Sequence, residues 1–87
     1  MYWVYILRCS DDSLYTGIAA DVERRFALHQ SGKGAKYTRS HPPVAVVYRE
    51  SFPDKSAALR REWTIKQLSR PEKLRLIEAQ AGVAETE

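Results

Sequence analysis

Cysteine is nearly missing from this sequence of 87 residues, because Cys9 is the only one. A single thiol can form neither an internal disulfide nor a zinc cluster, so it predicts a reducing compartment, the cytoplasm. Long apolar runs are missing too, since no segment approaches the roughly 20 consecutive apolar residues that a membrane span needs. The first three residues, MYW, carry no basic side chain, so a signal peptide is not expected.

A large excess of charge of either sign is also missing. The net charge is +3, with 44% hydrophobic and 29% charged residues, which is typical of a globular protein. This mild positive balance permits nucleic-acid binding without requiring it. A chain of this length has room for one hydrophobic core. We therefore expect a single domain over residues 1–82 and a frayed tail over residues 83–87.

The first part of the chain predicts a β-hairpin. Residues 2–9 (YWVYILRC) are rich in aromatic and β-branched residues, which is typical of a strand covered on both faces. Residues 10–13 (SDDS) have turn chemistry, and residues 14–18 (LYTGI) form the returning strand. A connection with an odd number of residues places Tyr5 and Tyr15 on the same face of the hairpin, whereas an even number separates them.

A helix is expected next, over residues 22–31, with Asp21 as N-cap and Gly32 as its stop. At 100° per residue, two apolar residues of this helix should face the core: Val22 and Phe26. Arg25 and His29 then lie at the edge of the buried stripe. This placement is unusual for an arginine and motivates a functional interpretation.

Residues 30–43 (QSGKGAKYTRSHPP) are expected to form a loop, because they combine glycines, paired prolines and small polar residues. The loop also concentrates positive charge, and Lys33, Lys36 and Arg39 flank Tyr37. These four residues are candidates for nucleic-acid contact. The alternative at about even odds is an ordinary solvated loop.

The rest of the chain predicts one strand and two helices. Residues 44–49 form the strand, a helix runs from Asp54 or Ser56 to about Leu68, and a last helix from near Ser69 stops at Gly82. The expected fold class is therefore α/β (α+β). It has a small three-stranded, mostly antiparallel sheet flanked by helices, in the order β-β-α-β-α-α.

Glu62 is the unusual residue of the helix that follows Asp54. It lies on the apolar stripe formed by three residues: Ala58, Leu59 and Ile65. A desolvated carboxylate needs compensation, and either Arg25 or a metal ion could supply it. Lys66, four residues further on, offers a third possibility, a surface ion pair. Trp63 is expected to anchor the same helix to the sheet.

Together these residues resemble the GIY-YIG nuclease superfamily. The resemblance rests on Val4-Tyr5-Ile6, on Tyr15-Thr16-Gly17, on Arg25 and His29 in one helix, and on Glu62 in a later one. It covers residues 2 to about 70 and is greatest for small stand-alone bacterial members. The stretches GKGAKYTRSHPP and SAALRREW are also similar to the nuclease domain of structure-specific junction endonucleases.

The resemblance implies a metal-dependent endonuclease that hydrolyses nucleic-acid phosphodiesters, with DNA favoured, single-stranded or branched, and a role in DNA repair or recombination. It implies that Glu62 binds Mg²⁺ or Mn²⁺ and that a motif tyrosine is the general base. We favour Tyr5 as the base and Tyr15 as the residue that orients water, although the two roles could be exchanged. The remaining implied roles fall on Arg25 as the phosphate-binding cation and on two accessory residues, His29 and Tyr37.

Two residues depart from the family pattern. Trp3 replaces the motif glycine, and Ile18 stands where some relatives carry a lysine. We expect no separate DNA-binding domain, so a protein partner could supply targeting. Two alternatives remain open: a nucleic-acid-binding module with a weak or vestigial nuclease site, and a structural domain in which Arg25 and Glu62 form a buried ion pair.

Overall fold

The computed structural model describes residues 1–86, and the side chains through residue 81. Three strands and four helices follow one another: β1 (Tyr2–Cys9), β2 (Leu14–Ala19), α1 (Val22–Gln30), α2 (Lys36–Ser40), β3 (Pro43–Phe52), α3 (Lys55–Lys66) and α4 (Arg70–Thr86). The strands form one antiparallel sheet in the order β2-β1-β3. The predicted fold class is confirmed, and the added element is α2, in the stretch expected to be a loop.

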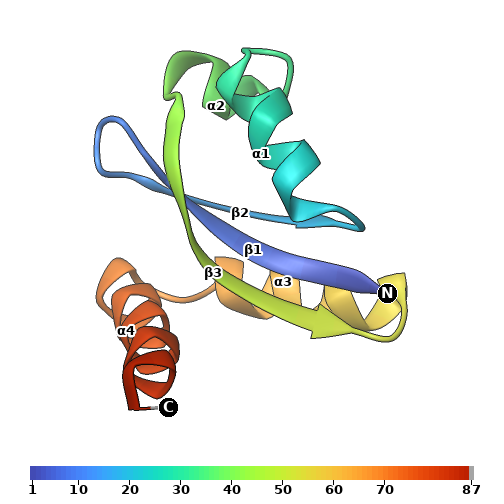
Figure 1. Ribbon diagram of the computed structural model, residues 1–87, viewed down its shortest axis with the longest axis vertical. Helices are drawn as coiled ribbons and strands as arrows, with labels where there is room; N and C mark the ends of the chain where they lie inside the picture. Colours follow the sequence, from blue (N-terminus) through green and yellow to red (C-terminus); the bar gives the residue numbers. More distant parts are fainter. Residues whose placement is uncertain (87) are drawn as a thin grey trace.

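The sheet lies between two layers of helices (Figure 1). α1 and α2 lie on one side of the sheet, and α3 and α4 lie on the other. β1 is the central strand, and its residues alternate between two cores. Val4 and Ile6 pack with α3, whereas Tyr5 and Leu7 pack with Val22 of α1. Burial on both faces explains why β1 is apolar along nearly its whole length.

The hairpin has the register that places both motif tyrosines on one face. Tyr5 is paired with Gly17 and Leu7 with Tyr15, so odd-numbered residues oppose odd-numbered residues. Residues 9–13 separate the last pair, which makes the connection odd. Of the two alternatives left open by the sequence, the same-face arrangement is confirmed.

Aspartate side chains cap the starts of two helices. The Asp21 carboxylate accepts from the Arg24 backbone N–H at 3.1 Å, and the Asp54 carboxylate accepts from the Ala57 N–H at 2.8 Å. The expected Asp21 cap is confirmed. Of the two residues considered as the start of α3, Asp54 and Ser56, Asp54 is the N-cap. Within residues 1–86, no helix is long and apolar enough to cross a membrane.

Several expected boundaries and one expected anchor were wrong. β3 is longer than residues 44–49 because it pairs with β1 from end to end. α4 continues past Gly82, where a helical glycine costs only about 1 kcal/mol. Trp63, the expected anchor of α3, is 67% exposed, and Leu59, which was expected on the inward apolar stripe, is 44% exposed. Fraying of residues 83–87 stays a prediction, and Glu87 lies outside the described residues.

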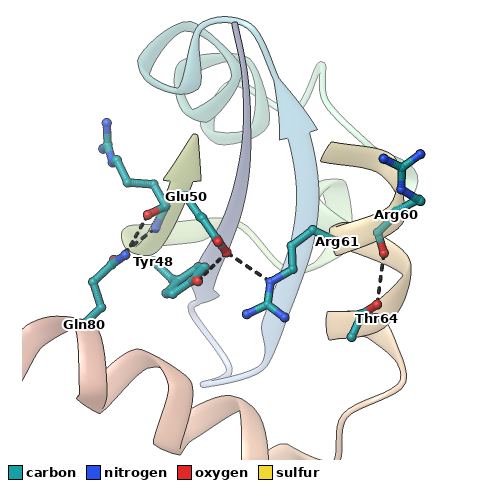
Figure 2. Close-up of polar contacts among 7 residues, drawn as sticks. Tyr48, Glu50, Arg60, Arg61, Thr64 and Gln80 are labelled. Carbon is teal, nitrogen blue, oxygen red and sulfur yellow. Dashed lines mark hydrogen bonds and ion pairs between the residues drawn. The ribbon is translucent and has the colours of Figure 1, made fainter. Parts of the chain in front are cut away.

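The two edges of the sheet are treated differently. At the β3 edge, Gln80 of α4 pairs with the backbone of Arg49: its amide donates to the carbonyl at 2.6 Å and accepts from the N–H at 3.1 Å. Nearby, Glu50 accepts from Tyr48 at 2.7 Å and from Arg61 at 3.0 Å, which ties α3 to β3 (Figure 2). Among the described residues, no strand covers the outer edge of β2.

We expect Gln80→Ala to lower the free energy of unfolding by about 1–2 kcal/mol, because two backbone groups of Arg49 lose their partner. The measurement is urea denaturation followed by circular dichroism. The matched control is Glu78→Ala, on an exposed position of the same helix. Equal midpoints for the two variants would contradict the assigned role of Gln80.

Candidate active site

A buried hydrogen bond joins the first motif tyrosine to the helix histidine. The Tyr5 hydroxyl of β1 lies 3.0 Å from Nε2 of His29 in α1. The two residues are 1% and 0% exposed. His29 was expected at the edge of the buried stripe, but it is fully buried. The chain after α1 turns back over His29 and forms α2. This helix was not predicted, because the polar composition of residues 30–43 is typical of a loop.

The second ring nitrogen of His29 is held by Thr38 of α2. Nδ1 lies 2.7 Å from the Thr38 hydroxyl, which donates its single proton to the Ala35 carbonyl at 2.9 Å. With that proton used, the hydroxyl is placed to accept from Nδ1–H. The Ala35 backbone N–H also donates to Nδ1, over a longer distance of 3.3 Å. The two contacts of Nδ1 require opposite tautomers, and the shorter one, to Thr38, favours a proton on Nδ1 and an Nε2 that accepts from the Tyr5 hydroxyl.

Two glycines make room for this chain of hydrogen bonds. A Cβ at Gly17 would lie 2.7 Å from the Tyr5 hydroxyl oxygen, and a Cβ at Gly34 would overlap the His29 ring. Neither position tolerates a side chain without moving the Tyr5–His29 pair. Gly17 belongs to the motif, whereas Gly34 and Thr38 were missed. The only sequence feature that could have drawn attention to them is the position of Gly34, two residues before Lys36 and Tyr37.

The electrostatics keep both members of the pair neutral. Burial raises the pKa of Tyr5; the Arg25 guanidinium beside it opposes this shift, and the negative charge of Glu62 adds to it. Burial and the positive charge of Arg25 lower the pKa of His29. A neutral imidazole at neutral pH can accept a proton. Arg25 is half-buried, as expected, and makes no ion pair with a described side chain.

Glu62 comes to the site from the opposite helix layer. α3 packs under β2, and the Glu62 charge acts on the Tyr5 hydroxyl. Its side chain is 18% exposed and pairs with Lys66 at 3.2 Å. Of the partners considered from the sequence, Lys66 is therefore the one that pairs with Glu62. Among the described side chains, Arg25 forms no ion pair with Glu62. The structural alternative that depended on an Arg25–Glu62 pair loses its basis.

The donor set around Glu62 suits a hard cation with few protein ligands. No cluster of three or more histidine, cysteine, aspartate or glutamate side chains occurs among the described residues. Mg²⁺ is often held by one or two carboxylates, with water and substrate oxygens completing its coordination. One accessible carboxylate, whose present partner is a long and flexible lysine side chain, fits that requirement. Glu62 would be the protein ligand.

The remaining candidates lie on β2, on α2 and in the turn before α2. Tyr15 packs against His29 at 5.2 Å between ring centroids, Tyr37 stacks on Tyr15 at 6.2 Å, and His41 stacks on Tyr37 at 4.3 Å. Tyr37 is thus joined to the site through rings. The basic residues point to solvent, and all three are exposed: Lys33, Lys36 and Arg39.

Comparison with known proteins agrees with the motifs. Residues 1–75 match the family described as the GIY-YIG catalytic domain. A UPF0213 protein of Staphylococcus haemolyticus is 54% identical over 77 residues, covering 88% of this chain and 94% of its own. One of Natronomonas pharaonis is 52% identical over 81 residues, covering 93% and 95%. This chain belongs to the GIY-YIG nuclease family.

Solved structures agree as well. The solution NMR structure of a UPF0213 protein from Bacillus halodurans is 48% identical and has a TM-score of 0.61, covering 94% of this chain and 88% of its own. A protein from E. faecalis, also solved by NMR, is 35% identical with the same TM-score of 0.61, covering 92% and 85%. The resemblance read from the motifs is confirmed.

We expect Gly17→Ala to shift the imidazole NMR signals of His29 and to destabilise the fold by about 1–3 kcal/mol, because the new methyl group collides with the Tyr5 hydroxyl. Gly32→Ala is the matched control. Gly32 has a φ of +81°, and a Cβ at this position would meet no atom within 4 Å, so this change should cost about 1 kcal/mol through the backbone alone. Unshifted imidazole signals in Gly17→Ala would refute the close packing.

Proposed function

We propose that this protein is a metal-dependent endonuclease that hydrolyses phosphodiester bonds, with single-stranded or branched DNA as its substrate. The observation that carries the proposal is the chain of hydrogen bonds from Tyr5 through His29 to Thr38. It lies within the electrostatic reach of Arg25 and Glu62. These are a proton acceptor, a cation and a metal-binding carboxylate, which are what phosphodiester hydrolysis requires.

Tyr5 is the proposed general base, and His29 makes it one. The raised pKa of Tyr5 means that its hydroxyl keeps its proton in the free protein. Nε2 of His29 accepts that proton as the hydroxyl takes one from the attacking water. Thr38 holds the other ring nitrogen and so fixes the tautomer that this transfer needs. Tyr15, which is half-buried and nearer to solvent, orients the water.

Arg25 and Glu62 deal with the charge of the phosphate. The planar guanidinium of Arg25 can bind two phosphoryl oxygens at once. Glu62 is the proposed ligand for Mg²⁺ or Mn²⁺, and a cation held there neutralises charge on the phosphate and on the leaving oxygen. The carboxylate must first release Lys66.

The form of the substrate is inferred from the surface around the site. Three exposed basic residues surround Tyr37: Lys33, Lys36 and Arg39. Side chains of this kind bind the backbone without reading sequence. An unpaired or branched strand suits such a surface, with targeting left to a protein partner. DNA is favoured over RNA on the resemblance alone.

A second candidate function is a nucleic-acid-binding module with a weak or vestigial nuclease site. One observation favours it: Lys66 occupies the Glu62 carboxylate at 3.2 Å. A lysine in that position competes with a metal ion for the same oxygens. Cleavage assays decide between the two functions.

We expect Glu62→Gln to lower the rate of cleavage by about 10²–10³-fold or more, because the substitution removes the charge that holds the cation. The assay uses labelled single-stranded, duplex and forked oligonucleotides with Mg²⁺, Mn²⁺ or EDTA. Glu78→Gln, an exposed glutamate on α4, is the control and should cleave like the wild type. Salt-sensitive binding without cleavage in any metal would select the binding module instead.

The pH dependence tests the role of His29. Because its pKa is lowered, the imidazole is neutral above about pH 6.5 and becomes protonated only below it. The rate should therefore fall on the acid side, where Nε2 can no longer accept from Tyr5. Folding also weakens there, since the unfolded histidine binds protons more readily than the buried one. Circular dichroism at each pH separates the two effects.

The variant His29→Gln should lose this acid limb together with most of its activity. Tyr5→Phe should cost about 10²–10⁴-fold, the usual contribution of a general base. Tyr15→Phe should cost less. The reverse order for the two tyrosines would exchange their roles, as the sequence alone allowed.

A further inference from the structure

A pocket lies at the start of β2, where Tyr15 of the candidate site forms part of its wall. Its volume is about 220 Å³. Four elements contribute residues to it: the edge strand β2 and the helices α2, α3 and α4. The residues that line it are Leu14, Tyr15, Thr16, Tyr37, Lys66 and Lys73.

The walls of this pocket differ in chemistry. Tyr15 and Tyr37 contribute two nearly parallel rings, with an angle of 17° between their planes. Lys66 and Lys73 contribute positive charge from α3 and α4. Lys66 is paired with Glu62, whereas Lys73 is half-buried and makes no ion pair with any described side chain. An ammonium group in this position lacks a counter-charge.

Thr16 supplies an independent sign that something binds there. It is 4% exposed, and its hydroxyl is the buried side-chain polar atom without a hydrogen-bond partner among the described residues. Leaving such a hydroxyl unsatisfied costs about 1–3 kcal/mol. Native structures avoid this cost. The hydroxyl is itself buried and belongs to a residue of the pocket wall, so a small group that enters from the pocket, water or part of a ligand, would complete its hydrogen bonding.

We propose that this pocket binds one unpaired nucleotide of the substrate strand, next to the phosphate that is cut. The inference rests on the nuclease function proposed above and deepens it. Lys66 and Lys73 bind the backbone phosphate, and the rings of Tyr15 and Tyr37 contact the base or sugar. Tyr15 lines the pocket and packs against His29 at 5.2 Å between ring centroids, and His29 is hydrogen-bonded to the Tyr5 hydroxyl, so the pocket adjoins the proposed base through these rings.

The size and chemistry of the pocket favour a single strand over a duplex. Pockets that enclose drug-sized ligands measure roughly 300–1,000 Å³, so this smaller one holds a single nucleotide unit. Aromatic rings bind only bases that are not paired and stacked inside a helix. Lysines and phenol rings carry no sequence code, so the pocket should accept every base.

The test measures binding without cleavage, in EDTA, by fluorescence anisotropy of a labelled octathymidylate over a range of salt concentrations. Lys73→Met should weaken binding about three- to fivefold and reduce the slope of log K against log salt by about 0.7, the loss of one phosphate contact. Lys73→Arg should restore the slope. The matched control is Lys55→Met, at the far end of α3, with wild-type slope expected.

A second measurement locates the ligand. Thymidine dinucleotide 5′-phosphate should shift the amide NMR signals of Thr16 and Tyr37, whereas thymidine alone should shift them much less. Equal salt slopes for Lys73→Met and Lys55→Met, or unmoved signals at Thr16, would overturn the subsite. If the wild type cleaves DNA but Lys73→Met has the wild-type slope of log K against log salt, the nucleotide pocket is refuted and the nuclease function is not. Binding through Lys73 by a chain that cuts nothing refutes the nuclease alone.

Discussion

The buried imidazole of His29 is the constraint on which the site depends. A ring with two polar nitrogens cannot be withdrawn from water unless both find partners. Tyr5 provides one partner from the sheet, and Thr38 provides the other from α2. The helix after the basic loop therefore has a structural reason to exist. It closes over His29, and Gly34 gives it the space to do so.

The free edge of β2 decides where chemistry can take place. α1 and α3 cover opposite faces of the sheet, so Arg25 and Glu62 could not meet across its middle. The charges of both residues nevertheless act on the pKa of one group, the Tyr5 hydroxyl, which lies against Gly17 of β2. The β3 edge is closed instead, by Gln80. One edge is bonded to a helix side chain, and the other is the edge at which we propose that substrate binds.

Local patterns in the sequence predicted much of this fold. Alternation placed Tyr5 and Tyr15 on one face once the register was known, and capping chemistry located the helix that starts after Asp21. The missed features all depend on contacts between distant segments. The burial of His29 requires α2, a helix of five residues whose polar composition is that of a loop. The exposure of Trp63 likewise depends on how α3 is rotated, which a weakly amphipathic sequence does not fix.

Charge balance links the two parts of the proposed substrate site. Lys66 neutralises Glu62 in the protein alone and also lines the neighbouring pocket. A cation that binds Glu62 would displace the lysine, which would then need another anion. A backbone phosphate in the pocket is such an anion. Cation and strand would therefore bind more favourably together than either does alone, because each compensates the charge that the other leaves unpaired.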